Sequence, residues 1–260
     1  MKVASIHQPN YLPWLGYFHK MTYCDVFVFL DDVQYTPRSY TNRCFLGSNG
    51  QKVRLSIPVH QESWDVPIRC VEIDARQFSR KHLEAFRHAY GKCSRYEEVI
   101  AVLEPFYRAG EISLAEFNAG LIRALAAFVG LRPRFVNLSE LGLTSKKNDL
   151  LIDISRKVGA DIFVSGVGAR KYISGHEARY LANGVRLAYQ SFQPPTYRQR
   201  EPGFVAGLSA VDLVFNHGPT AREILTSQTE PPYLEWTAAS AGASPVGISA
   251  SDDSCEDETL

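Results

Sequence analysis

The most constraining feature of this chain is the alternation of apolar runs and polar loops across its first forty-three residues. Residues 3–6 and 26–30 are apolar runs of strand length, and the spacing between them fits one short helix over 15–23. A strand, a helix and a second strand in that order form a β-α-β unit. Polar residues follow both runs, and in an open α/β sheet ligands bind beyond the carboxyl ends of the strands. The sequence therefore predicts an α/β fold with a polar site at one sheet edge.

The later part of the chain repeats this alternation. Strands are predicted over 134–137, 161–165 and 185–190, and helices over 145–158 and 174–183. Strands that alternate with helices indicate a mostly parallel open sheet with helices on both faces, of the nucleotidyltransferase-like or Rossmann-like kind.

The middle of the chain has a different pattern. Ser48-Asn49-Gly50 is a strong turn signal, so a hairpin is predicted between Phe45-Leu46 and a strand over 53–59. A short strand is predicted over 70–73. Helical periodicity then covers 79–90, 96–109 and 113–129, which makes a helical subregion at about 79–130. We expect residues 1–237 to form a single domain that contains this subregion.

Composition narrows the class of protein. At 260 residues and 45% hydrophobic content the chain can bury a sizeable core, and no apolar run approaches the length of a membrane span. The first apolar run is short and is interrupted by His7, Gln8 and Pro9, which argues against a signal peptide. The five cysteines are scattered without a C-x-x-C pair, which indicates neither a zinc site nor a disulfide framework. We therefore expect a cytoplasmic protein with no membrane span, and the sequence assigns no residue as a metal ligand.

Charge is distributed unevenly along the chain. The whole sequence balances 28 basic against 28 acidic residues, but residues 237–260 contain five acidic residues and no Lys or Arg. The remainder has 28 basic and 23 acidic residues, a net charge of +5, which favours an anionic small-molecule ligand but is too weak to indicate nucleic acid. Residues 238–260 are rich in small and acidic residues, and we expect a disordered acidic tail.

The loop after the first apolar run is the first candidate site. Its polar residues stand where packing alone needs none, and two prolines stiffen it before the helix at Gly16. A rigid loop that leads into a helix start is suited to binding phosphate. The alternative is a hydrophobic turn that only packs its aromatic rings into the core. The residues predicted here are His7 as a catalytic group and Gln8, Asn10, Tyr11, Trp14 and Gly16 as substrate or phosphate ligands.

The second candidate cluster follows the second apolar run. Asp31 and Asp32 are adjacent in a strand and point to opposite faces, so they are not a paired acid and base. One carboxylate could hold a substrate amine or Mg²⁺, and arginine could bind phosphate or carboxylate in a bidentate manner. The alternative is an internal Asp–Arg ion pair that fixes a loop. The residues predicted here are Asp31, Asp32 and Arg43 as catalytic groups and Gln34, Arg38 and Asn42 as ligands.

A third cluster combines glycines with basic residues after the predicted strand over 161–165. A glycine turn with cations at a helix start is a generic anion site, but the full G-x-G-x-x-G pattern of nicotinamide cofactor proteins is absent. A second helix start, at 144–147, adds hydroxyls and cations, with an ordinary N-cap as its alternative. The predicted ligands are Ser145, Lys146, Ser165, Gly166, Gly168, Arg170 and Lys171.

Ser209, Asp212 and His217 contain the residue types of a hydrolase triad. No nucleophile elbow surrounds Ser209, however, so we interpret it as a helix cap.

Two resemblances add to this interpretation. The order of strand, loop and helix start is similar to that of nucleotidyltransferases, although Trp14-Leu15-Gly16-Tyr17 lacks both histidines of their His-x-Gly-His segment. More specifically, residues 3–226 resemble the WbqC-like family. The matching segments are Gln8 to Phe18, Phe29 to Gln34, Asn42-Arg43, Thr144-Ser145-Lys146, Ser165 to Tyr172 and Leu208 to Asn216. This resemblance implies work on amino sugars or sugar nucleotides in surface-polysaccharide or natural-product biosynthesis.

Together these features predict an enzyme that transfers an acyl or aminoacyl group to an amine, forming an amide on a nucleotide-linked amino sugar. One version activates a carboxylate with ATP and Mg²⁺ as cofactors. A second version takes the acyl group from a carrier thioester. The alternative from another class is a non-catalytic assembly protein that binds a sugar nucleotide.

Overall fold

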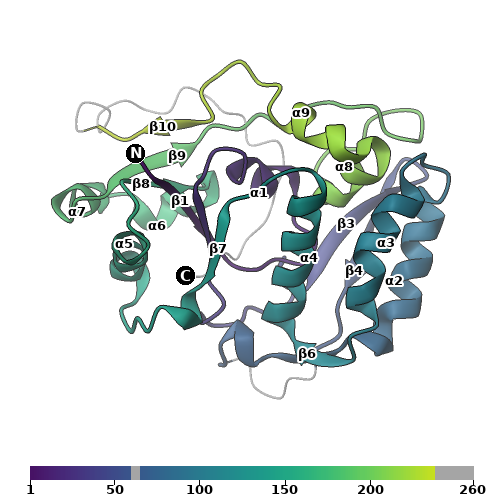
Figure 1. Ribbon diagram of the computed structural model, residues 1–260, viewed down its shortest axis with the longest axis horizontal. Coiled ribbons are helices and arrows are strands. Elements are labelled where there is room, and N and C mark those ends of the chain that lie inside the picture. Colours follow the sequence, from purple (N-terminus) through teal and green to yellow (C-terminus); the bar gives the residue numbers. More distant parts are fainter. Residues whose placement is uncertain (60–64, 238–260) are drawn as a thin grey trace.

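The computed structural model describes residues 1–59 and 65–237, so the tail predicted for 238–260 lies outside the described residues. Its centre is a six-stranded sheet in the order β10-β9-β8-β1-β2-β7 (Figure 1). Five neighbouring strands run parallel, and only β10 is antiparallel. The strands are β1 (Val3–His7), β2 (Val26–Phe29), β7 (Arg134–Asn137), β8 (Ile162–Ser165), β9 (Arg186–Gln190) and β10 (Tyr233–Glu235). The predicted mixed α/β architecture with a mostly parallel main sheet is confirmed.

The strand order reverses beside β1. From β1 the chain adds β2 and then β7 on one side, whereas β8 and β9 are added on the other side. Connections therefore leave the carboxyl ends of β1 and β8 in opposite directions, which opens a crevice between two neighbouring strands. This switch point is the part of an open parallel sheet where ligands are usually bound.

Helices cover both faces of the main sheet. Along β2, Phe27 and Phe29 face one core cluster and Val26 and Val28 face the other, as expected for strands buried on both faces. Packed with the first pair are α1 (Leu15–Lys20), α4 (Leu114–Phe128), α8 (Ala210–His217) and α9 (Ala221–Leu225). Packed with the second pair are α5 (Lys147–Lys157), α6 (Arg170–Ile173) and α7 (Glu177–Ala182).

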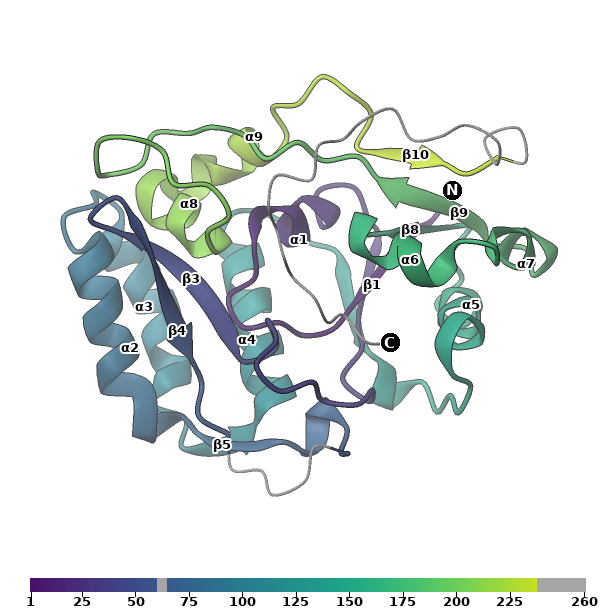
Figure 2. The same cartoon turned by 180° about the vertical axis from the view of Figure 1, so that it is seen from behind.

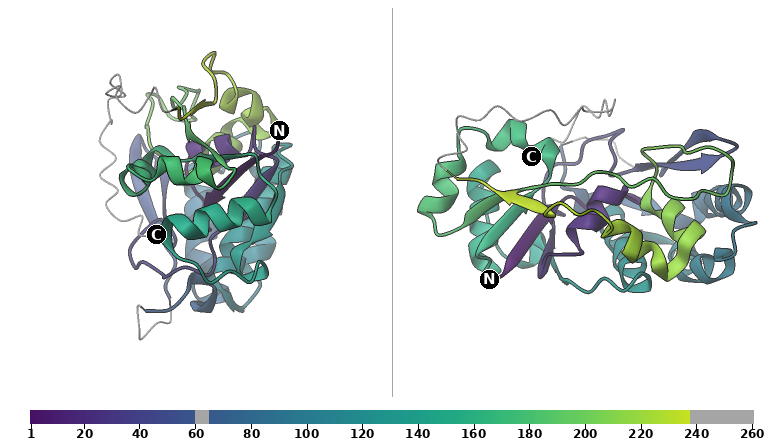
Figure 3. Two further views of the ribbon diagram at one scale, coloured as in Figure 1. Left: turned by 90° about the vertical axis from the view of Figure 1, so that its left-hand side faces the viewer. Right: turned by 90° about the horizontal axis from the view of Figure 1, so that it is seen from above.

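The middle of the chain lies at the opposite end of the molecule from α5 and α7 (Figures 2 and 3). It contains the hairpin β3 (Arg43–Ser48) and β4 (Gln51–Ser56), the pair β5 (Glu72–Asp74) and β6 (Glu111–Ser113), and the helices α2 (Ala75–Tyr90) and α3 (Tyr96–Tyr107). Short 3-10 helices cover Ile68–Cys70, Leu138–Glu140, Val167–Ala169 and Gly218–Thr220. Asn49 and Gly50 both have positive φ, of 51° and 72°, as a two-residue hairpin turn requires. The predicted hairpin is therefore confirmed.

Helix starts differ from the predictions because the capping groups differ. The first helix of the middle begins at Ala75 rather than at residue 79, since the Asp74 carboxylate accepts a hydrogen bond from the Arg76 backbone N–H at 3.1 Å. Ser145 does not cap α5: the N-cap is Lys146, which makes no capping hydrogen bond. The helix predicted to begin at Ser174 begins instead at Glu177, whose carboxylate accepts from the Gly175 N–H at 2.7 Å.

Among the described helices, none combines the length and the apolar character that crossing a membrane would require.

Candidate functional site

A cavity lies at the switch point, beyond the carboxyl ends of β1 and β8. It contains about 480 Å³ of space, part of which is open solvent. The lining residues are Ile6, His7, Gln8, Leu30, Leu151, Phe163, Ser165, Gly166, Ala169 and Tyr172. We call this cavity the strand-end crevice. Four of its lining residues, His7, Gln8, Ser165 and Gly166, belong to the sets predicted from sequence.

His7 is the histidine among the residues that line the crevice. Its ring packs edge-on against Tyr17 and Trp14, with centroid distances of 4.7 and 5.5 Å. Its Nδ1 lies 3.2 Å from the backbone carbonyl oxygen of Gln8, and a carbonyl can only accept a hydrogen bond. Nδ1 therefore carries the proton in the neutral ring, and Nε2 is the nitrogen that can accept one.

The loop that follows His7 is held in place by buried hydrogen bonds. Tyr17 donates its hydroxyl to the Gln8 carbonyl at 2.8 Å. Asn118 of α4 donates its Nδ2 to the carbonyls of Pro9 at 2.8 Å and Thr41 at 2.7 Å, which ties this loop to the segment 38–43. Because Thr41 Oγ1 also donates to Gln8 Oε1 at 3.4 Å, the crevice and the segment 38–43 adjoin each other.

Three predicted ligands of this loop have mainly packing positions. Asn10 and Tyr11 are buried, and the Tyr11 hydroxyl lies 2.7 Å from His82 Nδ1 and 2.6 Å from the Tyr107 hydroxyl. A Cβ on Gly16 would lie 3.0 Å from Nε1 of Trp14, so the space above this glycine is filled by the indole rather than left for a phosphate. The half-buried Trp14 stays next to His7.

Asp31 and Asp32 each have a protein partner. The Asp31 carboxylate accepts from the Ser139 backbone N–H at 2.9 Å and from the Ser139 hydroxyl at 2.5 Å, which fixes the segment after β7 against the end of β2. Asp32 forms an ion pair with Arg69 at 2.7 Å. The alternative predicted from sequence, an internal Asp–Arg pair, therefore describes Asp32, although its partner is neither of the arginines named there.

The remaining predicted residues of this segment surround the start of the hairpin. Asn42 is buried and donates its Nδ2 to the Ile57 carbonyl at 3.1 Å. Gln34 is exposed and forms an isolated bridge with Pro67. Arg43 donates to the Arg38 carbonyl at 2.9 Å, and its Nε is buried without a hydrogen-bond partner among the described residues.

The glycine-rich segment after β8 lies only partly in the crevice. Ser165 and Gly166 line it, whereas Gly168 is exposed on the short 3-10 helix. Arg170 follows the lining residue Ala169 and places its guanidinium 4.5 Å from the centroid of Tyr189. Lys171 lies over the ring of Tyr172 at 4.8 Å.

The two predicted ligands at the start of α5 are not in the crevice lining. Lys146 is exposed, and the Ser145 hydroxyl is buried with no hydrogen-bond partner in the described part of the chain. Leu151, one turn further along α5, is the residue of this helix that reaches the crevice.

Sequence reasoning missed Lys20 of α1. This residue is only 1% exposed, and its Nζ lies 3.6 Å from the position that a Cβ on Gly166 would occupy, next to the end of β8. Its ammonium lies 5.5 Å from the ring centroid of Tyr17, which contacts His7. A single lysine at the end of a six-residue helix is normally solvated, so no local pattern marks it.

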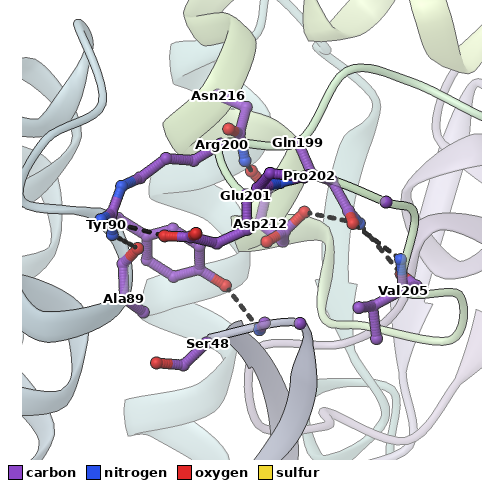
Figure 4. Close-up of a pocket in the computed structure, with 13 residues that line it drawn as sticks. Ser48, Ala89, Tyr90, Gln199, Arg200, Glu201, Pro202, Val205, Asp212 and Asn216 are labelled. Atoms are coloured by element: carbon purple, nitrogen blue, oxygen red, sulfur yellow. Dashed lines mark hydrogen bonds and ion pairs between the residues drawn. The ribbon is translucent and has the colours of Figure 1, made fainter.

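A second cavity, of about 320 Å³, lies between the hairpin turn, the end of α2 and the segment 199–205 (Figure 4). The buried Asp212 carboxylate of α8 is in its wall and accepts from the Tyr197 hydroxyl at 2.8 Å and from Gln199 Nε2 at 3.2 Å. Burial raises the pKa of Asp212, while hydrogen bonds from Tyr197, Tyr90 and Gln199 oppose the shift. Because this carboxylate is already saturated with donors, we consider it structural. Ser209 caps α8 by accepting from the Val211 N–H at 3.2 Å, as predicted.

His82, which contacts Tyr11, gives the fold a testable pH dependence. Burial lowers the pKa of His82 to about 4, below its ordinary value of 6.5 in an unfolded chain. As pH falls from 7 to 5 the unfolded chain takes up a proton that the native state does not, so stability decreases toward acid. We expect this residue alone to remove about 2 kcal/mol of unfolding free energy between pH 7 and pH 5.

Urea unfolding at both pH values, for the parent chain and for His82→Gln, measures this effect. The variant should lose about 2 kcal/mol less across the interval, whatever its stability at pH 7. Equal losses in the two proteins would show that His82 is protonated as readily in the native state as in the unfolded chain.

Comparison with known proteins gives one family. The profile of the WbqC-like protein family matches residues 8–224. A relative from Mycobacterium tuberculosis, Uncharacterized protein Rv1507c, is 28% identical over 228 residues, which cover 86% of this chain and 98% of that protein. No solved structure matches the chain.

Proposed function

This chain belongs to the WbqC-like protein family, and we propose that it is an N-acyltransferase that forms an amide on the amino group of a nucleotide-linked sugar. The observation that carries the proposal is the position of His7, which is one of the residues lining a cavity at the switch point of a mostly parallel sheet. A general base beside the bound amine is what transfer of an acyl group to that amine requires.

In the proposed reaction, the neutral amine attacks the carbonyl carbon of an activated acyl group. A carbon–nitrogen bond forms, the carbonyl oxygen becomes negatively charged, and the bond to the leaving group then breaks. His7 accepts the proton that the amine nitrogen loses and returns it to the leaving group. Lys20 beside Gly166, and Arg170 after Ala169, supply positive charge near the strand ends, which stabilises the oxyanion and an anionic leaving group.

The acyl donor is either a carboxylate activated by ATP or a carrier thioester. The proposal uses neither Asp31 nor Asp32 as a ligand of Mg²⁺, because their carboxylates are hydrogen-bonded to Ser139 and Arg69. Within residues 1–59 and 65–237, no three His, Cys, Asp or Glu side chains are grouped to hold a metal ion. We therefore assign Asp31 a positioning role rather than contact with a metal or an amine.

The test is product formation with both donors. Purified protein is incubated with a TDP-linked amino sugar and either ATP, Mg²⁺ and glycine, or an acyl-carrier protein thioester. Mass spectrometry detects the amide, and release of AMP, ADP or free thiol identifies the donor. Amide formation supports the proposal. Binding of the sugar nucleotide with no amide from either donor, across a panel of amino sugars and acids, would instead identify a non-catalytic sugar-nucleotide-binding protein.

A further inference from the structure

We propose that Arg38, Arg43 and Arg54, which we call the arginine cluster, form the diphosphate subsite of the substrate. We also propose that the sugar lies between this cluster and His7. The inference rests on the proposed function for the direction of the amine, but the subsite itself is argued from the described side chains. It narrows the substrate class from a nucleotide-linked amino sugar in general to one carried on a nucleoside diphosphate.

The arginine cluster gathers three positive charges on the hairpin and the turn before it. Burial lowers the pKa of the Arg43 guanidinium, and the nearby positive charges of Arg54 and Arg38 lower it further. None of the three forms an ion pair with a described residue. Like charges held together are unfavourable unless an anion joins them, and guanidinium groups are well shaped to bind phosphate.

The backbone of the hairpin and of the turn before it brings the arginine cluster together. In the antiparallel hairpin Phe45 lies opposite Arg54, so Arg43, two residues before Phe45, projects from the same face as both. Arg38 has a φ of 63°, a left-handed conformation that is uncommon for residues other than glycine. Its carbonyl accepts the Arg43 hydrogen bond, so this strained turn contacts the arginine that is central to the cluster.

A row of half-buried rings connects the strand-end crevice to the arginine cluster. The centroid distances are 5.5 Å from His7 to Trp14, 5.2 Å from Trp14 to Tyr40, and 6.4 Å from Tyr40 to Phe45. Tyr40 and Phe45 flank Arg43 in the sequence, so the row ends at the cluster. Aromatic side chains with a few polar groups are typical of small-molecule sites. A sugar against Trp14 and Tyr40 would present its amine to His7 and its diphosphate to the arginines.

Equilibrium binding without an acyl donor tests the inference. Isothermal titration calorimetry compares TDP, TMP, inorganic pyrophosphate and TDP-glucose, which has no amine and cannot react. We expect TDP to bind at least tenfold more tightly than TMP. The variants Arg43→Gln and Arg54→Gln should remove this preference by weakening TDP at least tenfold, whereas TMP should change by about twofold or less. Pyrophosphate should follow TDP in its dependence on the arginines.

Two further variants make the result specific. Lys52→Gln removes the same charge from the same hairpin, two residues from Arg54, and should leave the preference for TDP unchanged. Tyr40→Leu should weaken TDP-glucose several-fold but not TDP, because the row holds the sugar. Equal affinity for TDP and TMP, or equal effects of the Lys52 and arginine variants, would overturn the subsite.

The two proposals can fail separately. If no amide forms but TDP binding depends on the arginines, the diphosphate subsite stands and the acyl transfer fails. If the amide forms while Arg43→Gln and Arg54→Gln leave the affinity for TDP unchanged, the acyl transfer stands and the subsite is overturned.

Discussion

Replacing His7 with glutamine should lower the rate of amide formation by about 10²–10⁴-fold, the range that a positioned general base contributes. Glutamine has a similar size and can still donate to the Gln8 carbonyl, but it cannot accept the amine proton. The loss should therefore be in kcat, while the affinity for a sugar nucleotide changes little. Steady-state kinetics with saturating donor, together with calorimetry of TDP-glucose, separates the two quantities.

A matched variant controls for removal of a histidine. His88 is exposed on α2, far along the chain from the crevice, and His88→Gln should retain full activity. If His7→Gln keeps more than about a tenth of the parent rate, His7 is not the general base.

The parts of the site that could be predicted are those determined by local pattern. The apolar runs at 3–6 and 26–30 became β1 and β2, and the polar residues after them lie at the sheet edge because parallel strands share one carboxyl end. His7 and Ser165 were expected as separate motifs, and the order of the strands brings both into the crevice lining.

The parts that could not be predicted depend on contacts between distant segments. Asp31 was expected to face a ligand, but Ser139, 108 residues away, takes its carboxylate. Tyr11 was expected to bind substrate, but Tyr107 and His82 take its hydroxyl. Residue propensities identify neither set of partners, because these hydrogen bonds form only after the helices and strands have packed together. Lys20 was not predicted as a site residue for the same reason. Its proximity to Gly166 requires α1 to lie beside the end of β8.

The predicted starts of two helices were wrong for a different reason. Ser145 and Ser174 are residue types that favour N-caps, and sequence spacing alone made them reasonable choices. In the structure Lys146 and His176 occupy those positions without a capping side chain, so packing of α5 and α7 against the sheet determines where these helices begin.

The second large effect concerns stability: Asp212→Ala should lower the free energy of unfolding by about 4 kcal/mol, because it leaves several buried donors unpaired. The carboxylate joins α8 to the segment 197–199 through Tyr197 and Gln199, and it also accepts from Tyr90 at the end of α2. Its removal leaves buried hydroxyl and amide donors without an acceptor, and each such group costs about 1–3 kcal/mol.

The substitution Asp212→Asn tests whether the hydrogen bonds or the charge carries this stability. The two tyrosine hydroxyls can rotate to accept from an amide, so the asparagine variant should lose about half as much as the alanine variant. Glu223 is the matched control, since it is also an acidic residue in the first turn of a helix but is exposed, and Glu223→Ala should change the unfolding free energy by less than about 0.5 kcal/mol. Urea unfolding of the three variants gives the comparison. If Asp212→Ala is no more harmful than Glu223→Ala, the donors around Asp212 find water instead, and the carboxylate does not hold α2, α8 and the segment 197–199 together.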